Sequence, residues 1–463
     1  MLELKFDAKK QLKIRLRAQS PMIHFQACDG GPSGVKVTES ETIGHIGGGL
    51  SGVTLRASEV RPKLDKYIFR RIAGIAPGEE LSGDHLLKVK KDLLKREEYQ
   101  DIFSDPDKTD YALKYKMSIQ VDKDELVRIV KLEKDPPENM PLEKRKKYYS
   151  SAYMPFFANS NKTPRMKGVL CDPVLTITCF NEHVRSLIVK YLKDFFFVTN
   201  FGTRQGKGFG SFVLEGSERE EASVVQALME NYGAKACYRM QVKNPPTELY
   251  FSDYFNYIGY FSQFMKSGRN DPGKRNKREN KNLYYVRGFI FQYMHSQGIG
   301  NEKKWMKINN ISPTYYTNHS TVNKEENEGE YRFVRAMLGT QNSIRYKEAE
   351  KKFTKIYIAD VTRGNDKFER VPSPVFYKII GNDIYIIAGR VPKRLFNHKF
   401  IFRGYHSESL ATPDAFDIDD FIKKYVEFYN DKSDENAPRQ QFFKEMKSAP
   451  MVEETSYEKS SID

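Results

Sequence analysis

The sequence predicts an α+β protein with more than one domain, and three observations lead to this. The chain has 463 residues, more than the roughly 100 to 200 residues of a typical domain. Segments with the two-residue alternation of strands are interleaved with segments that have the 3.6-residue period of helices. The composition, with 30% charged and 13% aromatic residues, is that of a folded protein with a solvated surface.

The first elements are a strand, a loop and a helix. Residues 11–19, QLKIRLRAQ, alternate between apolar and polar side chains and predict the first strand. Residues 29–52 contain eight glycines, which excludes a regular element and predicts a long loop. Ser58 is expected to cap a helix whose apolar stripe runs from Val60 to Ile72.

The rest of the first half continues this mixture of elements. Helices are expected over 84–98 and 182–197, and strands over 114–121, 174–180 and 209–214. The resulting order of strand, helix, strands, helix and strand is that of a ferredoxin-like (RRM-like) unit, an antiparallel sheet with helices on one face. The segment FGTRQGKGFG links the last helix to the last strand.

The second half predicts a related unit. Helices are expected over 249–265 and 284–297, and a strand over 354–361. Two further strands, 374–380 and 384–388, are separated by a Gly-Asn-Asp hairpin signal. The prediction is therefore two ferredoxin-like units with a helical, loop-rich insertion. The expected domains are 1–235 with a Gly-rich loop at 202–210, 236–430, and a polar, disordered tail at 431–463.

The charge of the chain favours a polyanionic partner. The formal net charge is +15, which attracts nucleic acid or an anionic membrane surface, although a solvated Lys-rich surface gives the same excess. No run of eighteen apolar residues occurs, so no membrane association is expected. The four cysteines form no C-x-x-C pair and suit a reducing cytosol. We expect a cytoplasmic protein without a metal site or cofactor.

The segment between Phe201 and Phe212 has the chemistry of a phosphate contact. Its glycines leave the backbone N–H groups accessible, and Arg204 and Lys207 add positive charge beside them. A tight helix-to-strand turn on a basic surface explains the same residues equally well. The choice between these interpretations depends on the rest of the chain.

Several separated stretches carry a family resemblance. SPMIHFQ at 20–26, LRASEVRPKLDKYI at 55–68 and FGTRQGKGFGSF at 201–212 resemble segments of the RAMP superfamily of CRISPR proteins. They are most similar to the large first subunit of type III-B (Cmr) effector complexes. In the second half, YFSQFMKSGRN, YRFVRAMLGT and ERVPSPVFYKII resemble the Lys-Ser-Gly, Arg-x-x-Leu-Gly and Arg-x-x-Ser-Pro elements of the same subunits.

The resemblance implies a non-catalytic RNA-binding subunit of a type III effector that acts in antiviral defence. The implied partners are CRISPR guide RNA at its 3′ end, target RNA and other RAMP effector subunits. Cations of the first helix and of the loop are expected to hold phosphates, although such charges often only solvate a surface. The candidate RNA-binding residues are Arg56, Arg61, Lys63, Arg71, Gly202, Arg204, Gln205, Gly206, Lys207, Gly208, Gly210 and Arg370.

Two alternatives stay open from the sequence. The first is a metal-independent CRISPR RNA-processing endoribonuclease, for which His24 and His45 are the candidate acid/base residues. The processing enzymes of the superfamily carry their Gly-rich loop near the C-terminus, whereas about 250 residues follow it here, so the effector subunit is favoured. The second alternative is a basic surface that binds only protein neighbours.

Overall fold

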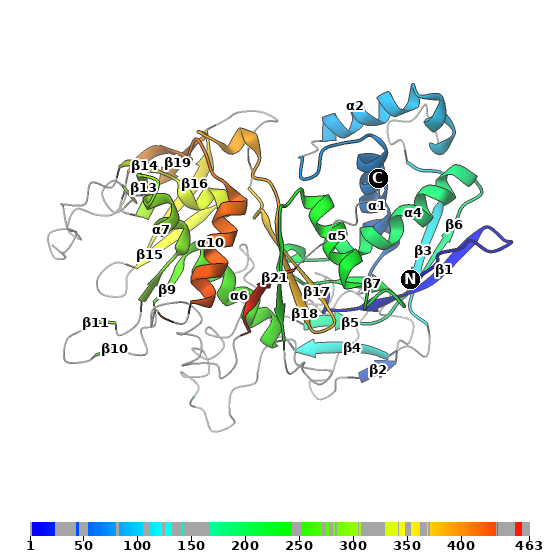
Figure 1. Ribbon diagram of the computed structural model, residues 1–463, viewed down its shortest axis with the longest axis horizontal. Coiled ribbons are helices and arrows are strands. Elements are labelled where there is room, and N and C mark those ends of the chain that lie inside the picture. Colours follow the sequence, from blue (N-terminus) through cyan, green and yellow to red (C-terminus); the bar gives the residue numbers. More distant parts are fainter. Residues whose placement is uncertain are drawn as a thin grey trace. The chain divides into compact units, whose positions relative to one another are not determined.

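The structure is a computed structural model that divides into two compact units (Figure 1). Unit 1 comprises 1–259, 376–387 and 450–463, and unit 2 comprises 260–375 and 388–449. Residues 236–259 and 376–387, assigned from the sequence to a second domain, thus belong to unit 1. The residues that the structure describes are 2–23, 43–45, 54–79, 83–104, 112–122, 126–131, 141, 167–242, 252–270, 275–276, 281–282, 285–303, 305–306, 329–340, 342–347, 353–361, 368, 371–404, 406–431, 433 and 450–455.

The first sheet of unit 1 is built from the strands expected in the first half. Its order is β3-β6-β1-β7, and all neighbours are antiparallel. Its helices, α1 (Ala57–Ile72) and α4 (Glu182–Val198), pack against each other and bury their apolar stripes. The expected strands are confirmed, but the last one is shorter than predicted. The strands are β1 (Gln11–Ala18), β3 (Lys116–Gln120), β6 (Val174–Thr178) and β7 (Phe212–Leu214).

The second sheet of unit 1 joins strands that are far apart in the sequence. Its order is β17-β18-β8-β21. Helix α6 (Ser252–Lys266) follows the first of these strands in the chain, and α10 (Ile418–Asn430) precedes the last. When the strands of each sheet are numbered by their order in the chain, both sheets have the strand order 2-3-1-4. The strands are β8 (Cys237–Gln241), β17 (Val375–Ile380), β18 (Asp383–Ala388) and β21 (Val452–Glu454).

Several sequence-based boundaries are corrected by the structure. Residues 452–454 lie in the expected disordered tail, yet they form β21 because they pair with β8. The helix expected over 284–297 is only α7 (Phe289–His295), preceded by strand β12 (Tyr285–Arg287). The N-cap of α1 is Arg56, whose side chain makes no cap hydrogen bond, and not Ser58. The hairpin of β17 and β18 is confirmed, with Gly381 at φ +57° in its turn.

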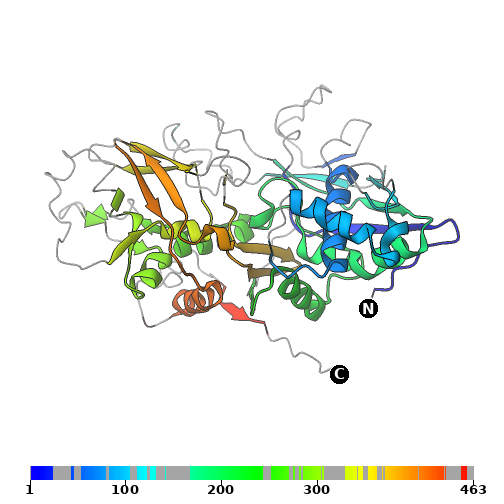
Figure 2. The ribbon, with the colours of Figure 1, turned by 90° about the horizontal axis from the view of Figure 1, so that it is seen from above.

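Unit 2 contains a four-stranded antiparallel sheet of order β15-β16-β19-β20 (Figure 2). The expected strand at 354–361 is β16 (Phe353–Asp360), whereas the other three were not predicted. They are β15 (Ser343–Lys347), β19 (Lys399–Arg403) and β20 (Ser407–Ala411). Phe333 packs edge-on against Phe400 and Phe402 on the buried face of this sheet.

The remaining elements are short or lie outside these sheets. In unit 1 they are α2 (Gly83–Leu94), η2 (Glu97–Ile102), η3 (Gln205–Lys207), α5 (Glu221–Tyr232) and the sheet of β2 (Ile43–His45), β4 (Leu126–Lys131) and β5 (Lys167–Leu170). In unit 2 they are β9 (Gly268–Asn270), β10 (Arg275–Asn276), β11 (Lys281–Asn282), β13 (Ile299–Asn301), β14 (Glu330–Arg332), η5 (Val334–Leu338) and η7 (Lys393–Leu395). Across the described ranges, no helix is long and apolar enough to cross a membrane.

One buried lysine holds the core of unit 1 together. Lys378, on β17, has no exposed surface, and its ammonium donates to the carbonyl oxygens of Phe196, Thr199 and Phe212 at 2.7, 2.9 and 3.1 Å. Burial lowers the pKa of Lys378 well below its usual value. An ammonium has three N–H donors, and three carbonyls surround it, so the geometry fits the charged form. Lys378 therefore joins the end of α4 and strand β7 to the second sheet.

We expect Lys378→Met to lower the free energy of unfolding by about 3 kcal/mol, because the three carbonyls would keep their burial without the ammonium that donates to them. Urea denaturation measures this change. The control is Lys13→Met, since Lys13 is an exposed lysine in strand β1 and a surface substitution of this kind changes stability by less than about 0.5 kcal/mol. Equal effects of the two substitutions would contradict a structural role for Lys378.

Candidate nucleic-acid interface

The Gly-rich loop has a backbone conformation that requires most of its glycines. Gly202, Gly208 and Gly210 have φ of +76°, +83° and +66°, a region that side chains rarely adopt. A Cβ atom on Gly210 would lie 1.9 Å from the carbonyl oxygen of Phe201, and one on Gly202 would lie 2.7 Å from that of Ile23. Around Gly206 there is open space. Gly202, Gly208 and Gly210 thus shape the loop, and Gly206 leaves the backbone accessible.

The segment after the first strand anchors this loop. Ser20 is fully buried, and its hydroxyl donates to the Gly208 carbonyl at 2.6 Å while it accepts from the Ser211 N–H at 2.9 Å. The Gly210 N–H donates to the Pro21 carbonyl at 3.0 Å. Two of the three stretches that carry the family resemblance in the first half therefore contact each other directly.

Helix α1, the third stretch, also contacts the loop. The Glu59 carboxylate accepts from the Gly202 N–H at 2.7 Å. The Lys63 ammonium donates to the Gln205 side-chain oxygen at 2.8 Å and lies 4.8 Å from the centre of the Phe201 ring. Burial lowers the pKa of Lys63, and the nearby Glu59 partly offsets this effect. A hydrogen bond between the Lys63 and Gln205 side chains therefore joins α1 to the loop.

Two cations of the loop itself lie beside its backbone. Lys207 and Arg204 are both half-buried, and Arg204 adopts a left-handed backbone with φ +60°. The Lys207 ammonium lies 5.0 Å from the centre of the buried Tyr377 ring. Burial, together with the positive charge of Arg204, lowers the pKa of Lys207 to about 8. Lys207 is therefore mostly protonated at pH 7 and mostly neutral at pH 9.

Two of the predicted first-helix arginines have structural contacts. Arg61 donates to the Leu113 carbonyl at 3.2 Å and lies over the Tyr115 ring. Arg71 donates to the Tyr67 hydroxyl at 3.0 Å and pairs with Glu230 at 3.4 Å. These contacts occupy part of each guanidinium in packing α1. The structure thus separates them from the cations that border the loop.

The structure describes two of the four remaining candidate residues. Arg56 is half-buried at the start of α1. His45 lies in β2, which pairs with β4. His24 and Arg370 lie outside the described residues.

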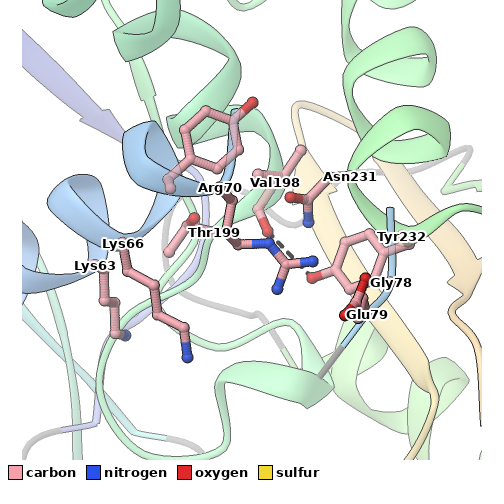
Figure 3. Close-up of a pocket in the computed structure, with 10 residues that line it drawn as sticks. Lys63, Lys66, Arg70, Gly78, Glu79, Val198, Thr199, Asn231 and Tyr232 are labelled. Atoms are coloured by element: carbon pink, nitrogen blue, oxygen red, sulfur yellow. Dashed lines mark hydrogen bonds between the residues drawn. The ribbon is translucent and has the colours of Figure 1, made fainter. Parts of the chain in front are cut away.

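A basic pocket adjoins α1 and the end of α4 (Figure 3). Its volume is about 310 Å³. Lys63, Lys66 and Arg70 line it from one stripe of α1, and Glu79 is the one carboxylate among its lining residues. Burial lowers the pKa of Arg70, while Glu79 favours its charged form. The full lining is Lys63, Lys66, Tyr67, Arg70, Gly78, Glu79, Val198, Thr199, Asn231 and Tyr232.

Lys66 and Arg70 are not among the residues predicted from the sequence to bind RNA. Their spacing from Lys63, three and seven residues along a helix, places all three on one face, and this signal was available. The lining residues from outside α1 depend on tertiary contacts that no local pattern shows. One example is the Tyr232 hydroxyl, which donates to the Val198 carbonyl at 3.2 Å.

Parts of the second-half motifs meet in unit 2 and make structural contacts there. Lys266 donates to the carbonyls of Leu338 and Gly339, which joins the Lys-Ser-Gly stretch to the Leu-Gly stretch. Arg335 of the latter stretch forms a buried ion pair with Glu302, which has no exposed surface. Lys266 and Arg335 therefore stabilise unit 2, whereas Lys378 of the third motif stabilises unit 1.

The third motif of the second half approaches Gly339 closely. A Cβ atom on Gly339, whose φ is +92°, would lie 2.9 Å from the Ser373 nitrogen. The Thr340 hydroxyl accepts from the Val371 N–H at 2.9 Å. A glycine is required here because two backbone segments touch.

Two models of known protein families match this chain. A model of the Cmr1 N-terminal domain matches residues 42–269, and a model of the Cmr1 C-terminal domain matches residues 264–448. No curated protein matches the chain. The two family models together cover residues 42–448, which contain all of the resembling stretches except SPMIHFQ at 20–26, so the resemblance noted in the sequence is confirmed. The chain therefore belongs to the Cmr1 family, the first subunit of type III-B CRISPR effector complexes, which assemble from several Cmr subunits.

Proposed function

We propose that this chain is a non-catalytic RNA-binding subunit of its effector complex. In this proposal it contacts the 3′ end of the guide RNA, the target RNA, or both, in antiviral defence. The observation that carries the proposal is the basic face where α1 meets the Gly-rich loop, with its adjoining pocket. Phosphate contacts of this kind position RNA without reading its sequence.

The connectivity of the two sheets supports the proposal. Along the chain, the strands of the first sheet with α1 and α4, and those of the second sheet with α6 and α10, both follow the order strand, helix, strand, strand, helix, strand. This is the order of a ferredoxin-like unit, and we propose that both sheets are of this type. The Gly-rich loop then occupies the connection between the second helix and the last strand of the first unit.

The chemistry of the face suits a phosphate. At neutral pH Arg204 and Lys207 are charged and flank a backbone that Gly206 leaves open. In the pocket, three cations face one carboxylate, so an anion entering it gains net attraction. The sugar-phosphate backbone of single-stranded RNA supplies such anions at regular intervals.

Replacing Arg204 and Lys207 together by Ala should weaken binding of single-stranded RNA regardless of its sequence. The slope of log K against log salt should fall by about 1.4, that is about 0.7 for each phosphate that the protein no longer neutralises. Fluorescence anisotropy over a salt series measures this slope. Lys190→Ala, at an exposed lysine on α4, is the matched control and should leave the slope unchanged.

An affinity that does not change with salt would contradict RNA binding by this face. It would favour the alternative in which the basic surface binds only protein neighbours. An unchanged thermal midpoint of the double variant shows that its weaker binding comes from the missing cations and not from unfolding.

RNA affinity should also depend on pH through Lys207. Its folded pKa of about 8 lies below the usual value, so the charged form is present at pH 7 and is lost as pH rises to 9. We expect affinity to fall up to about tenfold over this interval, because the charged fraction of Lys207 falls about tenfold between one pH unit below its pKa and one pH unit above it. Lys207→Arg stays charged throughout and should remove this part of the pH dependence. Equal pH profiles for the two proteins would contradict a contact by Lys207.

We also propose that the purified chain does not cut RNA. Repeat RNA incubated with the purified protein without metal should stay intact, as seen on a denaturing gel. Cleavage that His24→Ala or His45→Ala abolishes, with RNA affinity unchanged, would establish the processing endoribonuclease instead. General acid/base catalysis by histidine would then explain the activity.

A further inference from the structure

The sheet of β15, β16, β19 and β20 in unit 2 has one exposed face with an aromatic residue near its centre. Along β16, Ile356, Ile358 and Asp360 are buried, so Lys355, Tyr357 and Ala359 point to the opposite face. The Tyr357 side chain is 53% exposed, which is unusual for a large aromatic residue in the middle of a sheet. Figure 2 shows α7 and α10 to one side of these strands.

The strand register places cations around this tyrosine. Arg403 of β19 lies directly opposite Tyr357 and is exposed. Lys355 lies two residues along the same strand, and its ammonium is 4.3 Å from the centre of the Tyr357 ring. Lys399 occupies the same face of β19 and is exposed. Other residues at positions on this face are Ser343, Ile401, Ser407, Ser409 and Ala411.

The charged residues at the described positions of this face are all cations. None of its described positions is Asp or Glu, and within the described part of the chain no carboxylate pairs with Lys355, Lys399 or Arg403. This differs from α1, where Lys63 and Arg71 have carboxylate partners. A cation that is not in an ion pair can bind phosphate without first breaking one.

The opposite face of the sheet packs against buried aromatic residues. Phe400 and Phe402 alternate with the exposed residues of β19 and are buried against Phe333. The position of Tyr357 is therefore fixed by a packed core and by strand pairing on both sides. A base that stacks on this ring costs the protein little conformational freedom, which is a condition for a useful stacking contact.

We propose that this sheet face is a second RNA contact, on which Tyr357 stacks a base of single-stranded RNA while Lys355, Lys399 and Arg403 hold its phosphates. The proposal rests on the proposed function in one respect, namely that the ligand is RNA. An exposed aromatic ring among cations on an antiparallel sheet is the arrangement with which sheets bind unpaired bases. A protein partner fits less well, because lysine is depleted at the centre of protein interfaces.

The test compares Tyr357→Ala with Tyr357→Phe in the full chain, using a single-stranded RNA oligonucleotide in fluorescence anisotropy. Removal of the ring should weaken binding about tenfold, a value within the range for one stacked base, whereas Phe keeps the ring and should bind as the wild type does. Phe180→Ala is the matched control, since Phe180 is 78% exposed in unit 1 and lies outside this sheet. An abasic oligonucleotide of the same length should bind the wild type and Tyr357→Ala equally.

Each outcome separates this proposal from the general function. If Tyr357→Ala binds RNA like the wild type while the Arg204 and Lys207 double variant does not, the sheet face is no RNA contact and the proposed function stands. If wild-type protein fails to bind RNA at all, the proposed function itself is wrong. Failure of Tyr357→Ala to assemble with other Cmr subunits, with RNA affinity unchanged, would make the face a protein interface and overturn the proposal.

Discussion

The buried ammonium of Lys378 is the interaction on which the rest of unit 1 depends. Its acceptors at Thr199 and Phe212 lie just before and just after the Gly-rich loop, so one side chain fixes both ends of that loop. The neighbouring residues of β17 add to this, because the carbonyls of Tyr377 and Ile379 accept from Asn200 and Ser211 at 2.9 and 2.6 Å. A loop that contacts phosphate gains affinity when its backbone is held in place beforehand. Strand β17 of the second sheet thus holds the Gly-rich loop of the first sheet in place.

The cations of this protein differ in what they already contact. Around α1, several charged groups hold the fold together, as Arg61 does with Leu113 and Arg71 with Glu230. In unit 2, Arg335 is used in the same way by the buried Glu302. A large positive net charge therefore says little about which residues meet a polyanion. The residues that remain available are those whose neighbours are backbone, aromatic rings or solvent.

Local patterns in the sequence predicted the elements whose periodicity is strong. Strand β1, helix α4 and the β17–β18 hairpin follow directly from alternation, an apolar stripe and a glycine turn. Two related units were predicted, but the last strand of the second sheet was not, because β21 has one buried residue and forms through pairing with β8, more than 200 residues earlier. A three-residue strand of this kind has no periodicity of its own.

The candidate site was predicted in outline and not in detail. The glycines and basic residues of the loop were visible because their residue types are unusual in that spacing. The partners that hold them, such as Glu59 and Asn200, are ordinary polar residues whose role depends on tertiary contacts. For the same reason Arg61 and Arg71 seemed equivalent to Lys63 in the sequence, although their surroundings differ.

The strands of the second sheet are far apart in the sequence, and this determines when they can pair during synthesis of the chain. Strand β8 ends at Gln241, and its neighbour β18 begins at Asp383, about 140 residues later. At about 5 to 20 residues per second, the ribosome leaves β8 without either neighbour for roughly 7 to 28 seconds. An unpaired strand edge in a nascent chain is prone to association with other chains, so chaperone binding during translation is most valuable in this interval.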